Sequence, residues 1–130
     1  MTMDVSFPGG MRVDVGYKGF TVMTDQPKQA GGDGGAPSPF DLFLASIGAC
    51  AGFYALNFCK ARKISTEGLG LSVELDYDDA QKMVGVVRIY LKLPDGFPGE
   101  YKDAMVRSVE SCTVKKHIQN PPAFEVMVRE

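Results

Sequence analysis

The stretch "LFLASIGACAGFYALNFC", residues 42–59, carries no charged side chain over eighteen positions, and Cys50 lies near its middle. Ser38 and Pro39 precede it and are typical of a helix start, because a hydroxyl caps the first turn and proline suits the first helical position. Asp41 falls in the first turn, where the helix dipole favours a negative charge. Basic residues, which suit a helix end, follow the stretch: Lys60, Arg62 and Lys63. We therefore predict one long helix that ends near Lys63.

Such a helix can span a membrane, fill a protein core or hold a reactive sulfur. Eighteen residues at about 1.5 Å each reach the lower bound for a bilayer, but Ser46 and Asn57 dilute the run, and we expect no membrane insertion. A helix that is apolar all round needs cover all round, and one small domain covers only part of it. Small residues along it would let a second helix approach, so we expect a homodimer: Ala45, Gly48, Ala49, Ala51, Gly52 and Ala55.

The sequence on both sides of the helix alternates apolar and polar residues, which predicts strands. Strands are expected at residues 3–7, 11–17 and 20–24 before the helix, and at 69–77, 82–93 and 123–129 after it, with a second helix at 100–112. The order lacks a regular strand–helix–strand alternation. It predicts an α+β fold with antiparallel sheets packed around the long Cys-bearing helix.

A glycine-rich loop, with "GGDGG" at residues 31–35, precedes the helix. No Gly-Lys-Ser/Thr follows it, so neither a phosphate loop nor a dinucleotide fingerprint fits. By composition the loop is a flexible connector or a lid.

Length and composition limit the classes of function. With 130 residues the chain suits a single domain over 1–130, and its net charge of −2 gives no basic surface for nucleic acid. Residues 1–10 have no basic segment followed by an apolar run, so we expect a cytoplasmic protein, where the three cysteines stay thiols. A single histidine and scattered cysteines offer no metal-ligand spacing, and we expect no metal.

Two motifs resemble those of a known family. "SPFDLFLASIGACAGFYA" at residues 38–55 resembles the central-helix motif of the OsmC-like family, the osmotically induced and organic hydroperoxide resistance proteins. "SCTVKKHIQNPP" at residues 111–122 resembles the second motif of that family, a cysteine followed by a short helix and a proline stop. The glycine-rich loop is most similar to a less characterised branch of the family.

The resemblance implies an intertwined homodimer that reduces organic hydroperoxides with a pair of cysteines at the interface. By position, Cys50 would attack the peroxide and Cys112 would resolve the product, with an external dithiol as reductant and no cofactor. Members of the family also use a glutamate ten residues before the first cysteine, where this chain has Phe40, with Asp41 one position later. Arg12 is the only arginine ahead of Cys50 and is thus the candidate for the family's N-terminal arginine.

The chemistry of peroxide reduction sets a condition on this site. The reactive species is a thiolate, and a free cysteine with a pKa near 8.5 is only about 3% thiolate at pH 7. Cys50 lies about three turns inside the predicted helix, beyond the reach of the helix dipole, so a cation such as Arg12 is required. Without that cation, the alternative is a non-catalytic dimer that binds an apolar small molecule in its interface pocket.

The other cysteine and the histidine are expected to be structural. Cys59 follows Cys50 by nine residues and points to the opposite face of the helix, where we expect it in the core. His117 lies five residues after Cys112, too far round a helix to form a Cys–His nucleophile pair, and we expect it to be exposed or to cap a helix.

Overall fold

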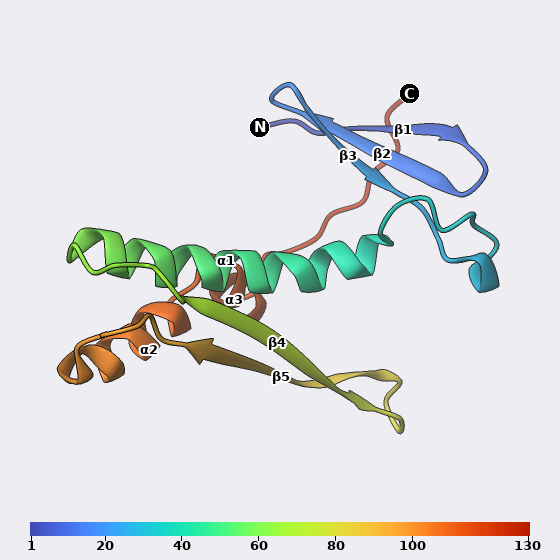
Figure 1. The fold of residues 1–130 in the computed structure, drawn as a ribbon. Helices are drawn as coiled ribbons and strands as arrows, with labels where there is room; N and C mark the ends of the chain where they lie inside the picture. The colour runs from blue at the N-terminus through green and yellow to red at the C-terminus, as the bar shows by residue number, and fades with distance from the viewer. The chain divides into compact units, whose positions relative to one another are not determined.

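The computed structural model describes all 130 residues, which form two units, Met1–Ala45 and Ser46–Glu130. The first unit contains a three-stranded antiparallel sheet in the order β1-β2-β3 (Figure 1). The turn between β2 and β3 needs positive φ angles, 46° at Lys18 and 81° at Gly19. Its elements are β1 (Asp4–Gly9), β2 (Arg12–Tyr17), β3 (Phe20–Thr24) and the 3₁₀ turn η1 (Lys28–Ala30).

The glycine-rich loop folds around the buried carboxylate of Asp25. This carboxylate accepts the backbone N–H groups of Gln26 at 2.7 Å and Gly35 at 3.1 Å, and these bonds hold the pKa of Asp25 below its ordinary value. The backbone passes so close to itself that a Cβ on Gly32 would lie 2.0 Å from the Gln26 carbonyl oxygen. The loop therefore has a defined, hydrogen-bonded shape, whereas its composition predicted a flexible connector.

The long predicted helix is present as α1 (Pro39–Ala61), which ends two residues before Lys63, where φ is 55°. Ser38 caps it as predicted, because its Oγ accepts the backbone N–H of Asp41 at 3.2 Å. By length and composition α1 is able to cross a membrane, a property that core helices of soluble proteins share. Of its most apolar 18-residue stretch, 28% is buried.

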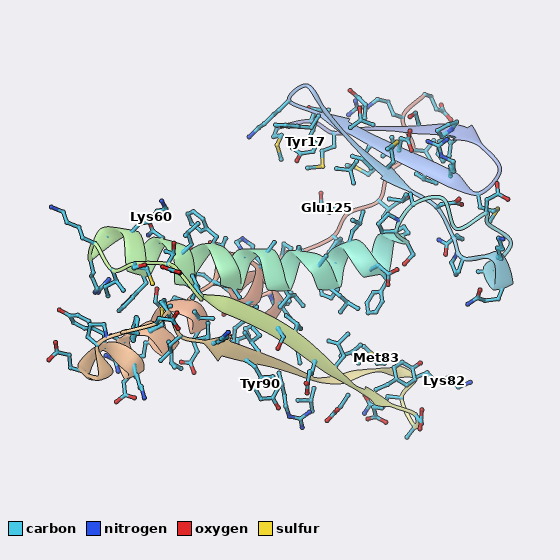
Figure 2. The ribbon with its side chains drawn as sticks, viewed as in Figure 1. Tyr17, Lys60, Lys82, Met83, Tyr90 and Glu125 are labelled. Atoms are coloured by element: carbon cyan, nitrogen blue, oxygen red, sulfur yellow. The ribbon has the colours of Figure 1, made fainter.

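The second unit continues from α1 into a long antiparallel hairpin and three short helical segments. The hairpin pairs Leu71 with Leu91, Val73 with Ile89 and Leu75 with Val87, which places apolar side chains on one face. Its turn, with Lys82 and Met83, is labelled in Figure 2. The elements are β4 (Gly70–Asp78), β5 (Met83–Lys92), η2 (Gly99–Tyr101), α2 (Lys102–Glu110) and α3 (Thr113–Gln119).

The core of the second unit lies between α1, the hairpin and α2. A Cβ on Gly48 would lie 3.2 Å from the Val73 side chain, so this glycine lets the helix approach the strand closely. Cys59 belongs to the core, as predicted, and is fully buried. The buried cluster is Ala51, Ala55, Phe58, Cys59, Met105 and Val109. The predicted α+β fold with antiparallel sheets is confirmed, while the single domain over 1–130 stays a prediction.

The strand predicted at residues 123–129 is absent, and this prediction is wrong for the chain by itself. Residues 121–130 have no regular structure, and Phe124 is 87% and Val126 97% exposed. A strand needs a neighbouring backbone with which to exchange hydrogen bonds, and no strand of this chain pairs with the segment.

Much apolar surface has no cover within the chain. The sheet of the first unit buries only the last residue of β3, Thr24, while α1 leaves Phe53 and the hairpin leaves Tyr77 exposed. The sequence predicted that one small domain covers only part of α1. In the chain, only the side of α1 that faces the hairpin and α2 is buried.

Candidate functional site

The second unit brings Cys50 and Cys112 together. Cys50 lies in the middle of α1 and is partly exposed, whereas Cys112 lies between α2 and α3 and is fully buried. The two thiols lie close enough for the Cys50 side chain to raise the pKa of the Cys112 thiol. No disulfide joins any of the three cysteines. Two sulfurs in such contact form a dithiol, the arrangement that disulfide chemistry requires.

Local folding places Cys112 on this side of the core. Met105 and Val109, one turn apart on α2, are buried in the core cluster and fix the orientation of that helix. The chain leaves α2 through backbone hydrogen bonds from Ser111 to Ser108 and from Cys112 to Val109. The position of Cys112 is therefore determined by the packing of Met105 and Val109 in the core.

Cys112 is also the N-cap of α3. Its Sγ accepts the backbone N–H of Lys115 at 3.3 Å, as a serine or aspartate oxygen does in an ordinary cap. Burial raises the pKa of the Cys112 thiol. The hydrogen bond from the Lys115 N–H lowers this pKa, while the interaction with Cys50 raises it further. Burial also raises the pKa of Cys59, which Arg62 partly offsets.

A second hydrogen bond joins the same two parts of the chain. The Tyr54 hydroxyl, one helical turn after Cys50, lies 2.7 Å from the Thr113 hydroxyl. Thr113 directly follows Cys112 in the sequence. The sequence analysis did not identify this contact. The spacing of four residues between Cys50 and Tyr54 was the available signal, but nothing in the sequence indicated Thr113 as the partner of Tyr54.

Arg12 and Asp41, the other predicted site residues, belong to the first unit. On β2 the Arg12 guanidinium lies 3.5 Å from the Asp14 carboxylate and 3.8 Å from the Met23 sulfur. The other oxygen of Asp14 is buried and has no hydrogen-bond partner. Asp41 is in the first turn of α1, where its N–H bonds to Ser38. The structure thus assembles the two thiols within one unit, and places neither the arginine nor the acid in that unit.

The second unit contains an apolar cavity of about 560 Å³, whose lining includes sequence neighbours of both cysteines but neither cysteine. Ile47, three residues before Cys50 on α1, and Val109, three residues before Cys112, both line it. Lys115, whose N–H bonds to Cys112, is one of two charged residues in the lining. The remaining lining residues are Val87, Ile89, Tyr90, Leu91, Val106, Glu110, Ile118 and Gln119. Tyr90 is labelled on β5 in Figure 2.

No side chains cluster as metal ligands would. The structure contains no group of three or more His, Cys, Asp or Glu residues arranged to hold a metal ion. His117 is exposed, as predicted, and its Nδ1 lies 2.7 Å from the Thr113 carbonyl oxygen within α3.

An α+β fold with a long apolar helix and a closely placed pair of thiols defines a protein with a candidate dithiol site. Residues 32–127 match the family model of the OsmC-like proteins, and the chain belongs to this family. The resemblance seen in residues 38–55 and 111–122 is thereby confirmed. No curated protein matches the chain.

Solved structures of two bacterial proteins share the fold. One, from Psychrobacter arcticus 273-4, is described as an osmotic stress induced and detoxification response protein; it is 21% identical, with a TM-score of 0.74, over 89% of this chain and 86% of that one. The other is an organic hydroperoxide resistance protein OsmC from Legionella pneumophila, described as a predicted redox protein; it is 24% identical, with a TM-score of 0.61, over 92% of this chain and 90% of that one.

The different burial of the three thiols predicts an order of alkylation. At pH 8, iodoacetamide should modify Cys50 about tenfold faster than Cys112 or Cys59, because alkylation needs an accessible thiolate. Folding raises the pKa of Cys112 and Cys59 above the ordinary value of a cysteine, so both should remain slow at this pH. Peptide mass spectrometry after timed quenching measures the order, and the urea-unfolded protein, with three equally reactive thiols, is the control. Equal rates for Cys50 and Cys112 in the folded protein would contradict the arrangement.

Proposed function

We propose that this OsmC-like protein is a thiol-dependent peroxidase that reduces organic hydroperoxides with Cys50 and Cys112. The observation that supports the proposal is the proximity of a partly exposed thiol on α1 to a buried thiol between α2 and α3. A peroxidatic thiol has to meet its substrate, while a resolving thiol has only to reach the first sulfur. The exposed and buried positions match these two tasks.

The reaction balances with these two thiols and an external dithiol. The Cys50 thiolate attacks one oxygen of the hydroperoxide, the O–O bond breaks, and the alkoxide takes up a proton and leaves as an alcohol. The resulting sulfenic acid is attacked by Cys112; its S–O bond breaks, and hydroxide leaves with the thiol proton as water. The disulfide is returned to two thiols by an external dithiol, such as those of the cytoplasm, and no cofactor takes part.

The apolar cavity suits an organic hydroperoxide better than hydrogen peroxide. Its walls include Ile47 and Val109, each three residues before a site cysteine, and such apolar walls suit an alkyl or aryl group. The same cavity supports the alternative function, a non-catalytic dimer that binds an apolar small molecule.

Consumption of thiols separates the two functions. After one equivalent of cumene hydroperoxide, the wild type should lose two thiols per chain, through a disulfide between Cys50 and Cys112, and Cys50→Ser should form no such disulfide. Intact mass and free-thiol counts under non-reducing conditions measure this, and Cys59→Ala is the matched variant that should behave as wild type. Three unreacted thiols in the folded wild type would favour the binding function.

Arg12 is proposed to stabilise the attacking thiolate, and Asp41 to orient that arginine. Arg12 already has a carboxylate partner in Asp14, which holds the guanidinium on β2. Arg12→Ala should slow hydroperoxide consumption about tenfold or more at pH 7 and move the half-maximal rate to higher pH, since a nearby cation favours the charged sulfur. Arg12→Lys should retain part of the rate. A pH–rate profile measures both effects, and an unchanged profile in Arg12→Ala would remove the residue from the site.

We propose that the protein is an intertwined homodimer. Large apolar side chains lie exposed in each unit, among them Phe7 and Phe20 of the first and Phe53 and Tyr77 of the second. The interfaces of obligate dimers are strongly apolar, and a second copy would cover such side chains. The unpaired segment at residues 123–129 alternates like a strand, and a sheet edge of a second copy would supply the backbone partners that its own chain lacks.

The dimer should persist to low protein concentration. Sedimentation equilibrium at micromolar concentration should give twice the chain mass of 14.1 kDa, and the urea midpoint should rise with protein concentration because unfolding and dissociation are coupled. Deleting residues 123–130 should weaken the dimer. A monomer in aqueous buffer whose unfolding does not depend on concentration would contradict the proposal.

A further inference from the structure

The bond between Tyr54 and Thr113 connects residues that are 59 positions apart in the sequence. At 2.7 Å between the two oxygens it is a hydrogen bond of ordinary length. Each partner is next to a cysteine of the candidate site: Tyr54 is one turn beyond Cys50 on the same face of α1, and Thr113 is the residue after Cys112.

These positions make two parallel bridges between α1 and the junction of α2 and α3. One bridge is the contact between the two thiols, and the other is the contact between the two hydroxyls. The first bridge changes during the proposed reaction, because both sulfurs change their bonding. The second can remain in place throughout, since neither hydroxyl is consumed.

We infer that the hydrogen bond between Tyr54 and Thr113 positions Cys112 for its attack on oxidised Cys50. The inference rests on the proposed peroxidase function and names two positioning residues for its second step. In that step the two sulfurs move from non-bonded proximity to the disulfide length of about 2.05 Å. In the reduced protein the Cys112 sulfur also accepts the Lys115 N–H.

The first step should not need this bond. Attack on the hydroperoxide involves Cys50 and the substrate, and α1 is fixed by its own core contacts at Ala51, Ala55 and Phe58. The resolving step depends instead on how often the Cys112 sulfur meets the sulfenic acid. A contact one residue away from Cys112 restricts that motion directly.

A purely structural role predicts a different result. The bond is exposed to solvent, and α2 is anchored independently by Met105 and Val109, so the loss of one hydroxyl should leave the fold intact. If the bond only supported the fold, its removal would lower stability and slow both steps alike. A positioning role slows the second step alone.

The test compares Tyr54→Phe and Thr113→Val with wild type in single-turnover reactions with cumene hydroperoxide. Trapping the sulfenic acid with dimedone gives the rate of the first step, and intact mass gives the rate of disulfide formation. Each variant should leave the first rate unchanged and slow the second about fivefold, the order expected for one hydrogen bond. Thr113→Ser should restore the rate, and Tyr77→Phe, which removes a phenol at the far end of β4, should match wild type.

The double variant separates a shared bond from two independent effects. Tyr54→Phe with Thr113→Val should be no slower than either single variant, because both changes remove the same interaction. Disulfide formation at the wild-type rate in both single variants, or equal slowing of both steps, would overturn the inference while leaving the peroxidase function intact. A folded wild type that loses no thiol would instead refute the peroxidase function, and this inference with it.

Discussion

Everything in this structure depends on how α1 is covered. The helix is apolar on every side, yet one chain supplies a hairpin and a short helix to only one of them. The covered side of α1 determines where the candidate site lies. The small residues Ala51 and Ala55 let α2 pack closely against α1, and Cys112, which follows α2, then lies near Cys50. The uncovered side of α1 and the sheet of the first unit carry exposed apolar side chains of a kind that a folded protein usually buries.

Local patterns were sufficient to predict most of the fold. The alternation in the hairpin strands, the Ser38 cap and the uncharged run of α1 each depend on neighbours in sequence, and each prediction was confirmed. The segment at 123–129 has the same alternation but no strand, because pairing depends on a partner that the pattern does not name. The prediction for the glycine-rich loop was wrong for the opposite reason. The composition of this segment indicates flexibility, but the buried carboxylate of Asp25 holds it in place through hydrogen bonds.

The residues of the candidate site also divide into those that the sequence predicted and those that it did not. The two motifs identified Cys50 and Cys112, and the structure places their thiols in contact. The contact between Tyr54 and Thr113 depends on the turn between α2 and α3, which sequence spacing does not fix. Arg12 and Asp41 were chosen by resemblance alone. Within their own unit, Arg12 forms a salt bridge with Asp14, and the backbone N–H of Asp41 donates to Ser38 at the start of α1.

The N-cap of α3 links helix stability to the oxidation state of one sulfur. Cys112 accepts the Lys115 N–H while it is a thiol, and a sulfur directed toward a disulfide gives up that geometry. An interaction that exists only in the reduced state stabilises that state, so it shifts the dithiol–disulfide equilibrium toward the thiols. Because α3 also lines the apolar cavity, this cap connects the state of the Cys112 sulfur to one wall of that cavity.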